Sequence, residues 1–319
     1  MTEYKGTKGG KVQNYDTDPG TPYVGQVWYN QNLGDLRVRS TTLTSAWATG
    51  GSLNTARDRL GGAGTQTAAL AFGAFNPSTS ANTELYDGSS WTEVNNLNVA
   101  RGRMGSNGTS TSALGYGGAN PSISNQTESW NGTNWTAVAT LNTARQQLAG
   151  AGADNTSALA FGGFNPPTYY ANTESWNGSS WTEVADLNTA RRDLGGNGII
   201  TSALAYGGDT PGSTAATESW NGSSWTDVAD LNTARRLAGA GTDNTNALGI
   251  GGETPGGASA LTESWNGSIW TETSDLNTAR QELGATGASN SSALAFGGSL
   301  NPPAVAFTEE WNAGLNLGA

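Results

Sequence analysis

The sequence predicts an all-β protein in which six four-stranded units surround one axis. The motif Leu-Asn-Thr/Val-Ala-Arg recurs six times at intervals of 44 to 46 residues. A tryptophan stands six residues before each copy, and glycine-rich turns separate short apolar runs. A period of this length, filled by short strands, is typical of β-propellers. The copies begin at Leu53, Leu97, Leu141, Leu187, Leu231 and Leu276.

Each unit carries four strand signals. The repeated arginine is followed by a Gly- and Ala-rich segment, such as 194–198, whose small residues suit a crowded innermost strand. A continuous apolar run, such as 159–163, predicts a second strand buried on both faces. An Asn-Gly pair between strand-like runs then predicts a tight hairpin of the third and fourth strands. These turns are Asn131-Gly132, Asn177-Gly178, Asn221-Gly222 and Asn266-Gly267, with Asp87-Gly88 as a variant.

The two ends of the repeat region complement each other. The segment 307–312 resembles a third strand but no fourth strand follows it, whereas Trp47 lacks a third-strand partner before it. We therefore predict that residues 42–49 pair with the strand that contains Trp311. This pairing would close the ring and remove the edges that an open ring exposes.

Double glycines mark the end of the apolar strand in five units, and an acidic residue, tryptophans and an arginine follow in order. This pattern resembles the kelch repeat over about 47–312, and the resemblance implies a kelch-type propeller. It does not fix a function, because kelch propellers serve as enzymes, scaffolds and adhesins. The glycine pairs are Gly117-Gly118, Gly162-Gly163, Gly207-Gly208, Gly251-Gly252 and Gly297-Gly298, and the first unit departs with Gly73-Ala74.

The first forty residues lack the repeat, so we divide the chain into residues 1–40, an extension with a hairpin, and 41–319, the propeller. Alternating apolar residues around Asn-Leu-Gly-Asp predict a hairpin over 23–40. An isolated hairpin is only marginally stable, so we expect it to pack on the propeller rim or on another chain, as in a homo-oligomer such as a trimer. The predicted attachment residues are Val27, Trp28, Tyr29, Leu36 and Val38.

The run Gly-Gln-Val-Trp-Tyr-Asn at 25–30, with a turn and Leu-Arg-Val after it, is similar to short modules of tailed-phage virion proteins. The repeats likewise resemble kelch-like runs in phage and marine viral sequences. The resemblance implies a non-enzymatic tail-fibre or decoration protein, made in the host cytoplasm and carried on the virion. Other virion proteins would bind its N-terminal segment, and a host-surface glycan or protein its propeller. Two alternatives stay open: a kelch scaffold that binds a peptide at the channel mouth, and a carbohydrate-active propeller enzyme.

Composition excludes several kinds of chemistry. The net charge is −11, and the 15 basic residues are scattered, which argues against nucleic acid as a partner. The chain has no Cys and no His, which excludes disulfides, thiolate zinc sites and histidine general bases. Galactose oxidase, a kelch-propeller enzyme, holds copper with Tyr, His and Cys, so that activity is excluded. We expect no cofactor, metal or catalytic residue, and the polar residues 1–20 predict neither a secretory signal nor membrane insertion.

The loops after the double glycines differ most between units, as expected where a rigid scaffold presents a binding surface. Tyr169 and Tyr170 lie in one such loop, and Arg192 and Arg236 break the symmetry of the repeat. These four are the predicted binding residues. The tryptophans are predicted to pack between sheets rather than to stack on sugars. Six repeated arginines are predicted to form structural salt bridges with six repeated glutamates, and the alternative is an arginine ring that binds an acidic ligand. The arginines are Arg57, Arg101, Arg145, Arg191, Arg235 and Arg280, and the glutamates are Glu84, Glu128, Glu174, Glu218, Glu263 and Glu309.

Overall fold

The computed structural model describes residues 12–20, 26–38, 45–75 and 78–314. These residues form strands and turns and no helix, so the all-β prediction is confirmed. They accordingly contain no helical segment that could cross a membrane. The chain divides into two compact units: Met1–Thr44 with Ala313–Ala319, and Ser45–Asn312.

The larger unit consists of four-stranded antiparallel sheets, as the repeat predicts, and its described residues form six of them. The innermost strands are β5 (Gly61–Thr65), β9 (Gly105–Thr109), β15 (Ala149–Asp154), β21 (Gly195–Ile199), β25 (Arg236–Asp243) and β29 (Gly284–Ser289). The second strands are β6 (Ala68–Ala74), β10 (Ser112–Tyr116), β16 (Ser157–Phe161), β22 (Ser202–Tyr206), β26 (Asn246–Thr254) and β30 (Ser292–Phe296).

The outer half of each sheet is a hairpin that carries the repeated tryptophans. The third strands are β7 (Ser80–Tyr86), β13 (Thr127–Trp130), β19 (Thr173–Trp176), β23 (Thr217–Trp220), β27 (Gly257–Trp265) and β31 (Thr308–Asn312). The fourth strands are β8 (Trp91–Val94), β14 (Trp135–Val138), β20 (Trp181–Glu183), β24 (Trp225–Asp227), β28 (Trp270–Glu272) and β4 (Ala46–Thr49). Short two-stranded ladders β11 (Ala119–Asn120) with β12 (Ser122–Ile123), and β17 (Phe164–Asn165) with β18 (Thr168–Tyr169), occupy two of the variable loops.

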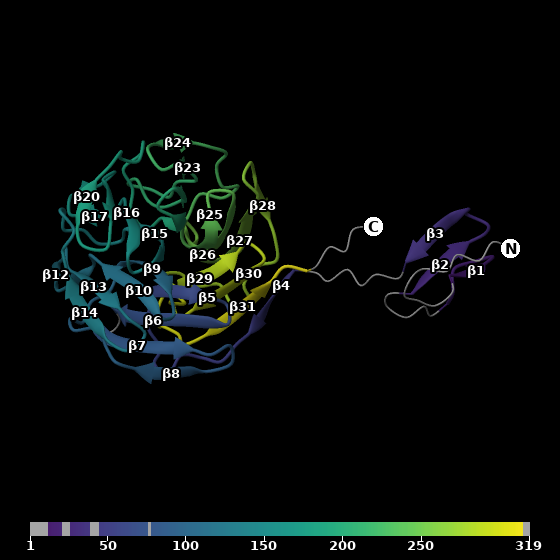
Figure 1. The fold of residues 1–319 in the computed structure, drawn as a ribbon, viewed down its shortest axis with the longest axis horizontal. Coiled ribbons are helices and arrows are strands. Elements are labelled where there is room, and N and C mark those ends of the chain that lie inside the picture. Colours follow the sequence, from purple (N-terminus) through teal and green to yellow (C-terminus); the bar gives the residue numbers. More distant parts are fainter. Residues whose placement is uncertain (1–11, 21–25, 39–44, 76–77, 315–319) are drawn as a thin grey trace. The chain divides into compact units, whose positions relative to one another are not determined.

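The sheets lie side by side around a common centre (Figure 1). Each innermost strand contacts the innermost strand of the next sheet, and β29 contacts β5. One sheet combines distant parts of the chain, because β4 pairs antiparallel with β31 and places Trp47 opposite Trp311. Residues 42–44 of the predicted closing segment lie outside the described residues. The arrangement is propeller-like.

The tryptophans join strands within a sheet and also join neighbouring sheets. In the third sheet Trp176 faces Trp181 across the hairpin, with ring centroids 5.4 Å apart. The ring of Trp181 also contacts Tyr116 of the preceding sheet at 5.0 Å, and its Nε1 donates a hydrogen bond to Thr127 of that sheet at 3.1 Å. Equivalent contacts recur around the unit, and all the repeated tryptophans are buried. The packing role predicted for them is confirmed.

Every repeated arginine forms a salt bridge with the repeated glutamate that follows it, as the structural interpretation predicted. Arg191 Nη1 lies 2.7 Å from Glu218 Oε1, and both side chains are almost fully buried. The other oxygen of Glu218 accepts a hydrogen bond from the backbone N–H of Asn188 at 2.6 Å, which fixes the Leu-Asn-Thr-Ala-Arg segment. Burial lowers the pKa of Arg191, and the charge of Glu218 opposes that shift. These arginines are thus enclosed by the fold and do not form an exposed ring.

The smaller unit contains one three-stranded sheet of β1 (Gln13–Tyr15), β2 (Val27–Asn30) and β3 (Asp35–Val38). The β2–β3 hairpin was predicted, and the parallel strand β1 was not.

On one face of this sheet, a carboxylate accepts two side-chain hydrogen bonds. Asp18 Oδ1 accepts hydrogen bonds from Trp28 Nε1 at 3.0 Å and from Asn30 Nδ2 at 2.8 Å, and the bond from Asn30 contributes most to lowering the pKa of Asp18. Side chains alternate between faces along a strand, so Val27, Tyr29 and Leu36 lie on the opposite face and are exposed. The side chain of the fifth predicted attachment residue, Val38, lies outside the described residues.

Candidate functional site

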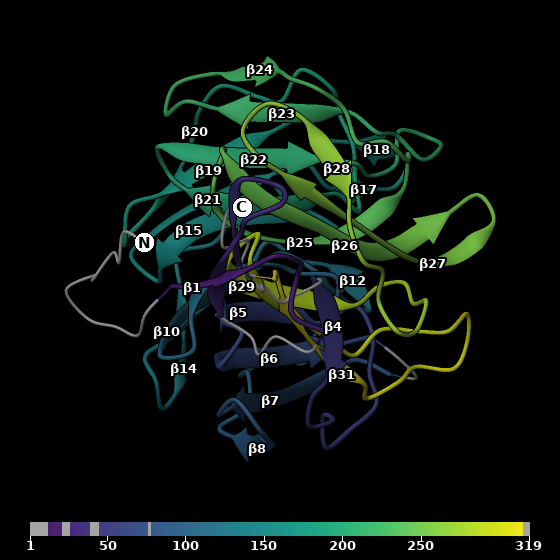
Figure 2. The ribbon, with the colours of Figure 1, turned by 90° about the vertical axis from the view of Figure 1, so that its right-hand side faces the viewer.

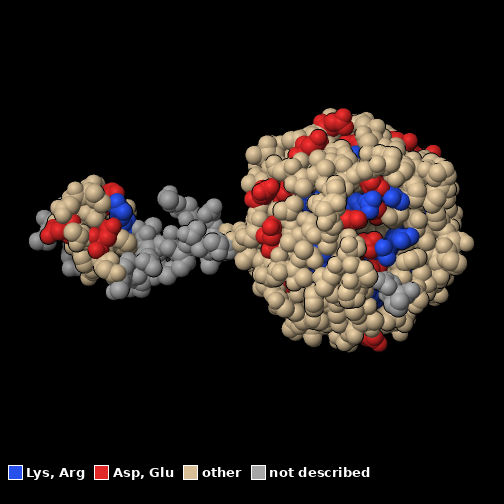
Figure 3. Space-filling model, turned by 180° about the vertical axis from the view of Figure 1, so that it is seen from behind, with Lys and Arg blue, Asp and Glu red and all other residues tan. Residues whose placement is uncertain are grey.

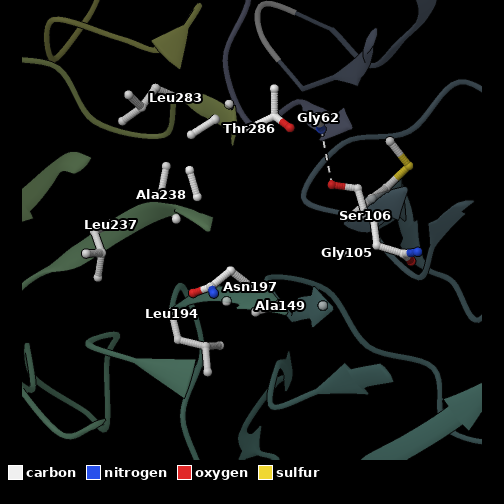
Figure 4. A pocket seen from close by; sticks show the side chains of 18 of the residues that line it. Gly62, Gly105, Ser106, Ala149, Leu194, Asn197, Leu237, Ala238, Leu283 and Thr286 are labelled. Carbon is white, nitrogen blue, oxygen red and sulfur yellow. Dashed lines mark hydrogen bonds between the residues drawn. The ribbon is translucent and has the colours of Figure 1, made fainter. Parts of the chain in front are cut away.

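A cavity of about 270 Å³ lies between the innermost strands of the six sheets. Figure 4 shows backbone and small side chains from several sheets around it, with Ser106, Asn197 and Thr286 among the polar ones. The Gly-rich composition of these strands follows from crowding. A Cβ at Gly62, for example, would lie 2.7 Å from the ring of Phe296 in the adjacent sheet. We call this space the central cavity.

A layer of polar side chains crosses the cavity at one register position. Asn107, Asn197 and Thr286 occupy it in alternate sheets, and alanines occupy it in the other three. The Asn107 amide donates to the carbonyl of Asp154 at 2.9 Å, and the Asn197 amide donates to that of Asp243 at 2.8 Å. Asn107 Oδ1 and Asn197 Oδ1 are buried and accept no hydrogen bond from the protein. Two amide oxygens in the wall of the cavity therefore lack a hydrogen-bond donor in the described residues.

The rim of the cavity is formed by the residue two positions after the repeated arginine in five sheets. All five have left-handed backbone conformations, with φ between 52° and 59°. Each of four of them donates its backbone N–H to the carbonyl of the equivalent residue in the preceding sheet; the Arg103 N–H, for example, reaches the Arg59 carbonyl at 2.8 Å. A series of backbone hydrogen bonds thus fixes the backbone of these residues. The rim residues are Arg59, Arg103, Gln147, Asp193 and Glu282.

The fifth sheet interrupts this rim. Its segment from Arg235 to Leu237 is one residue shorter than its counterparts, so it has no left-handed residue. Arg236 instead begins β25 and pairs with Glu253 of β26. The β26–β27 hairpin of the same sheet is longer than its counterparts and extends past the ends of neighbouring strands (Figure 2). At this position Arg236 and Glu253 line the cavity in place of a left-handed residue.

Charged side chains gather near the centre of the rim face (Figure 3). Arg59 contacts two carboxylates: Nη2 lies 2.6 Å from Glu282 and Nη1 lies 3.3 Å from Asp58. The guanidinium of Arg103 stacks on Phe75, 4.2 Å from the ring centroid, and that of Arg59 lies 5.6 Å from the same ring. Within the described part of the chain Arg103 forms no salt bridge. Burial lowers the pKa of Arg103, and the charge of Arg59 lowers it further.

The rim also carries two carboxylates, Glu282 and Asp193. Burial raises the pKa of Glu282 to about 7, although Arg59 opposes the shift. Burial also raises the pKa of Asp193, against the effect of a hydrogen bond from Gln147 Nε2 at 2.7 Å. The rim is therefore divided, with two arginines side by side and a carboxylate at each end of the series.

Three of the four predicted binding residues meet at a residue that the sequence did not single out. Asp209 Oδ2 lies 2.9 Å from Arg192 Nε and 3.3 Å from Arg236 Nη2, and the Tyr169 hydroxyl donates to it at 3.4 Å. Arg192 also stacks over Phe164 at 4.3 Å.

Among the described residues, the side chain of Tyr170 forms no hydrogen bond with this cluster. Its backbone N–H donates to the Gly163 carbonyl, and its own carbonyl accepts from Arg191.

The Asp209 cluster is internally balanced. Burial alone would raise the pKa of Asp209, but the hydrogen bond from Arg192 and the charge of Arg236 lower it. Burial alone would lower the pKa of Arg236, but Glu253 at 2.7 Å, with two aspartates, raises it. The cluster connects the third, fourth and fifth sheets at the position where the fifth sheet lacks a left-handed rim residue.

Sequence reasoning missed Arg59, Arg103, Asp193 and Glu282. The available signal was the position itself, because the second residue after an otherwise repeated arginine changes its charge from unit to unit. In the described residues, no group of three or more acidic side chains is placed to hold a metal ion. Comparisons with models of protein families and with curated protein sequences find no match for this chain.

Proposed function

We propose that the chain is a non-enzymatic structural protein of a phage particle. In this proposal a closed six-bladed kelch-type propeller presents a binding surface to the host, and residues 1–40 attach it to other virion proteins. The short resemblances at 25–30 and in the repeats support this assignment. The cyclic contacts of the innermost strands, including that between β29 and β5, support closure of the propeller.

One observation carries the proposal: the chain enters and leaves the larger unit at the end of the sheets opposite the rim. In the sheet of β29, β30, β31 and β4, Ser292 pairs with Asn312, which pairs with Ala46. At the other end of this sheet Gly284 pairs with Phe296, and Glu282 of the rim lies two residues before Gly284. The rim and the variable loops therefore lie at the end of the larger unit that is not joined to the N-terminal segment.

The separation of repeated, buried residues from variable, exposed ones also supports display of a binding surface. The repeated Trp, Arg and Glu side chains are buried and bonded to one another, as in the pair of Arg101 and Glu128. They give a frame that holds its shape without disulfides. What differs from sheet to sheet is concentrated at one face, which suits recognition of a surface.

Attachment is assigned to the exposed apolar face of the smaller unit. Val27 and Tyr29 are each 37% exposed, and Leu36 is 64% exposed. A three-stranded sheet of this size buries little apolar surface by itself, so this face gains from covering by another chain. A homo-oligomer such as a trimer, or a neighbouring virion protein, would provide the cover.

The test is incorporation into particles, quantified by mass spectrometry of purified virions. The double variant Tyr29→Asp/Leu36→Asp places two charges on the apolar face and is expected to be lost from particles. The matched control Gln31→Asp/Asn32→Asp adds the same charge at the exposed turn of the same hairpin and is expected to be incorporated normally. Equal incorporation of both variants would overturn the attachment role. Absence of the wild-type chain from particles would overturn the virion assignment.

A further inference from the structure

The rim contains one arginine, Arg103, that has no direct carboxylate partner in the described residues. Arg103 forms no salt bridge in the described residues, and its buried Nε has no hydrogen-bond partner. Its Nη1 donates only a long bond, 3.4 Å, to Gln146 Oε1. The neighbouring charge of Arg59 repels it, since both guanidinium groups lie near the ring of Phe75, while the charges of Glu282, Asp193 and Asp58 attract it without contacting it directly. An anion bound beside the guanidinium of Arg103 would offset that repulsion.

We propose that Arg59 and Arg103, at the mouth of the central cavity, bind the carboxylate of an acidic sugar. The inference rests on the proposed display function and names the class of host-surface ligand that the rim would recognise.

The backbone supports a role for these side chains beyond folding. A non-glycine residue with φ near 55° costs about 1 kcal/mol relative to its ordinary conformations. The same chain places glycine at other left-handed positions, such as Gly117 and Gly162. At the rim it instead holds Arg59 at φ 54° and Arg103 at φ 59°. The backbone hydrogen bonds of the rim fix the backbone at both arginines, which line the cavity.

The chemistry around the arginines favours a sugar over an acidic peptide. The cavity below them contains Asn107 Oδ1 and Asn197 Oδ1, which lack donors, on side chains only 6% and 5% exposed. After a small shift of the two amide side chains, hydroxyl groups of a sugar would supply the donors that such buried acceptors require. The side chain of a Glu or Asp would bring a carboxylate into this narrow cavity but no donor.

The carboxylates of the rim set the orientation of the ligand. Asp193 and Glu282 accept hydrogen bonds and repel anions, so they would face the hydroxyl groups of the sugar. The carboxylate of the ligand would face the side of the rim where Arg59 and Arg103 lie together. Arg192 and Arg236 contribute little to this attraction, since Asp209 and Glu253 already balance them.

The test is calorimetric titration of the full chain with N-acetylneuraminic acid and with glucuronic acid. The methyl ester of glucuronic acid serves as the uncharged control, and an acetylated Glu-Glu peptide serves as the acidic-peptide control. We expect at least one acidic sugar to bind, with the ester at least about tenfold weaker because it lacks the charge that pairs with arginine. Arg103→Gln is expected to weaken binding by about tenfold. Gln147 already occupies the equivalent left-handed position, so glutamine fits there. Arg37→Gln, in the smaller unit, removes the same charge and should leave binding unchanged.

Three outcomes would overturn the site: neither acidic sugar binds, the ester binds as tightly as the acid, or the peptide binds more tightly than both sugars. Normal binding by a folded Arg103→Gln variant would do the same. These results are independent of display, because Arg103→Gln is expected to enter particles normally. Sugar binding by a chain that never enters particles would keep the site and reject the virion role.

Discussion

Arg101 and Arg103 lie two residues apart on one segment, yet they differ in burial, in backbone conformation and in their salt bridges. Arg101 is fully buried, and its Nη1 lies 2.6 Å from Glu128 Oε1, a geometry that its counterparts repeat in the other sheets. Arg103 is half-buried at the rim, left-handed in backbone and without a salt bridge in the described residues. The repeated positions thus form the buried frame, while the side chain two residues after the repeated arginine varies in charge from sheet to sheet.

The largest expected effect comes from breaking the buried pair. Arg101→Met should lower the free energy of unfolding by about 3–5 kcal/mol, because it leaves the carboxylate of Glu128 buried without its cation. Arg103→Gln, by contrast, should change stability by less than about 1 kcal/mol, since it removes no ion pair. Chemical denaturation of the two variants beside the wild type measures the difference.

A double variant identifies the cause of that loss. Arg101→Met/Glu128→Gln removes both charges while keeping an acceptor for the backbone N–H of Asn98. It should recover part of the lost stability, because an uncompensated buried charge costs more than a neutral pair. If the double variant is no more stable than Arg101→Met, lost packing rather than the buried charge explains the effect.

The same contrast explains how much the sequence could predict. The salt bridge of Arg101 and the tryptophan contacts were predictable, because each of these residues has a partner that repeats with the same period. The pairing of Trp47 with Trp311 followed from the incomplete units at the two ends. Periodicity therefore predicted the sheets, their order and their core.

The rim was not predictable by that route. The salt bridge between Arg59 and Glu282 joins residues from the two ends of the repeat region. The left-handed backbone of the rim cannot be recognised in the sequence, because its residues are not glycines. Arg192 and Arg236 were noticed because they break the repeat, but their common partner Asp209 lies in a loop whose sequence differs from unit to unit. The strand β1 was missed because it is only three residues long and polar.

A smaller effect is expected from pH on the proposed sugar site. The pKa of Glu282 is raised to about 7 by burial, so this group loses its charge as the pH falls from 8 to 6. Its salt bridge with Arg59 then disappears, and the guanidinium becomes available to an anion. Asp58 and Asp193 also face Glu282, and both favour its protonation. Acidic-sugar affinity should rise by about threefold to tenfold over this range.

The variant Glu282→Gln separates this effect from other titrations. It should bind the sugar with the higher affinity at pH 8, and its affinity should vary little down to pH 6. Titration calorimetry of both proteins at pH 6, 7 and 8 provides the comparison. A variant with the same pH dependence as the wild type would show that another group controls binding.

The smallest expected effect isolates the backbone strain at the rim. Arg103→Ala and Arg103→Gly both remove the guanidinium, so they differ only in how well the new residue tolerates φ 59°. Glycine adopts this conformation without steric cost, whereas alanine does not, and the glycine variant should be more stable by about 1 kcal/mol. At Thr136, an exposed position in β14, the order should reverse, because glycine in an ordinary strand is less stable than alanine by about 0.5–1 kcal/mol. Thermal and chemical denaturation of the four variants measure both differences. The same order at both positions would mean that the rim carries no backbone strain. Its left-handed conformation would then give no support for a binding role of its arginines.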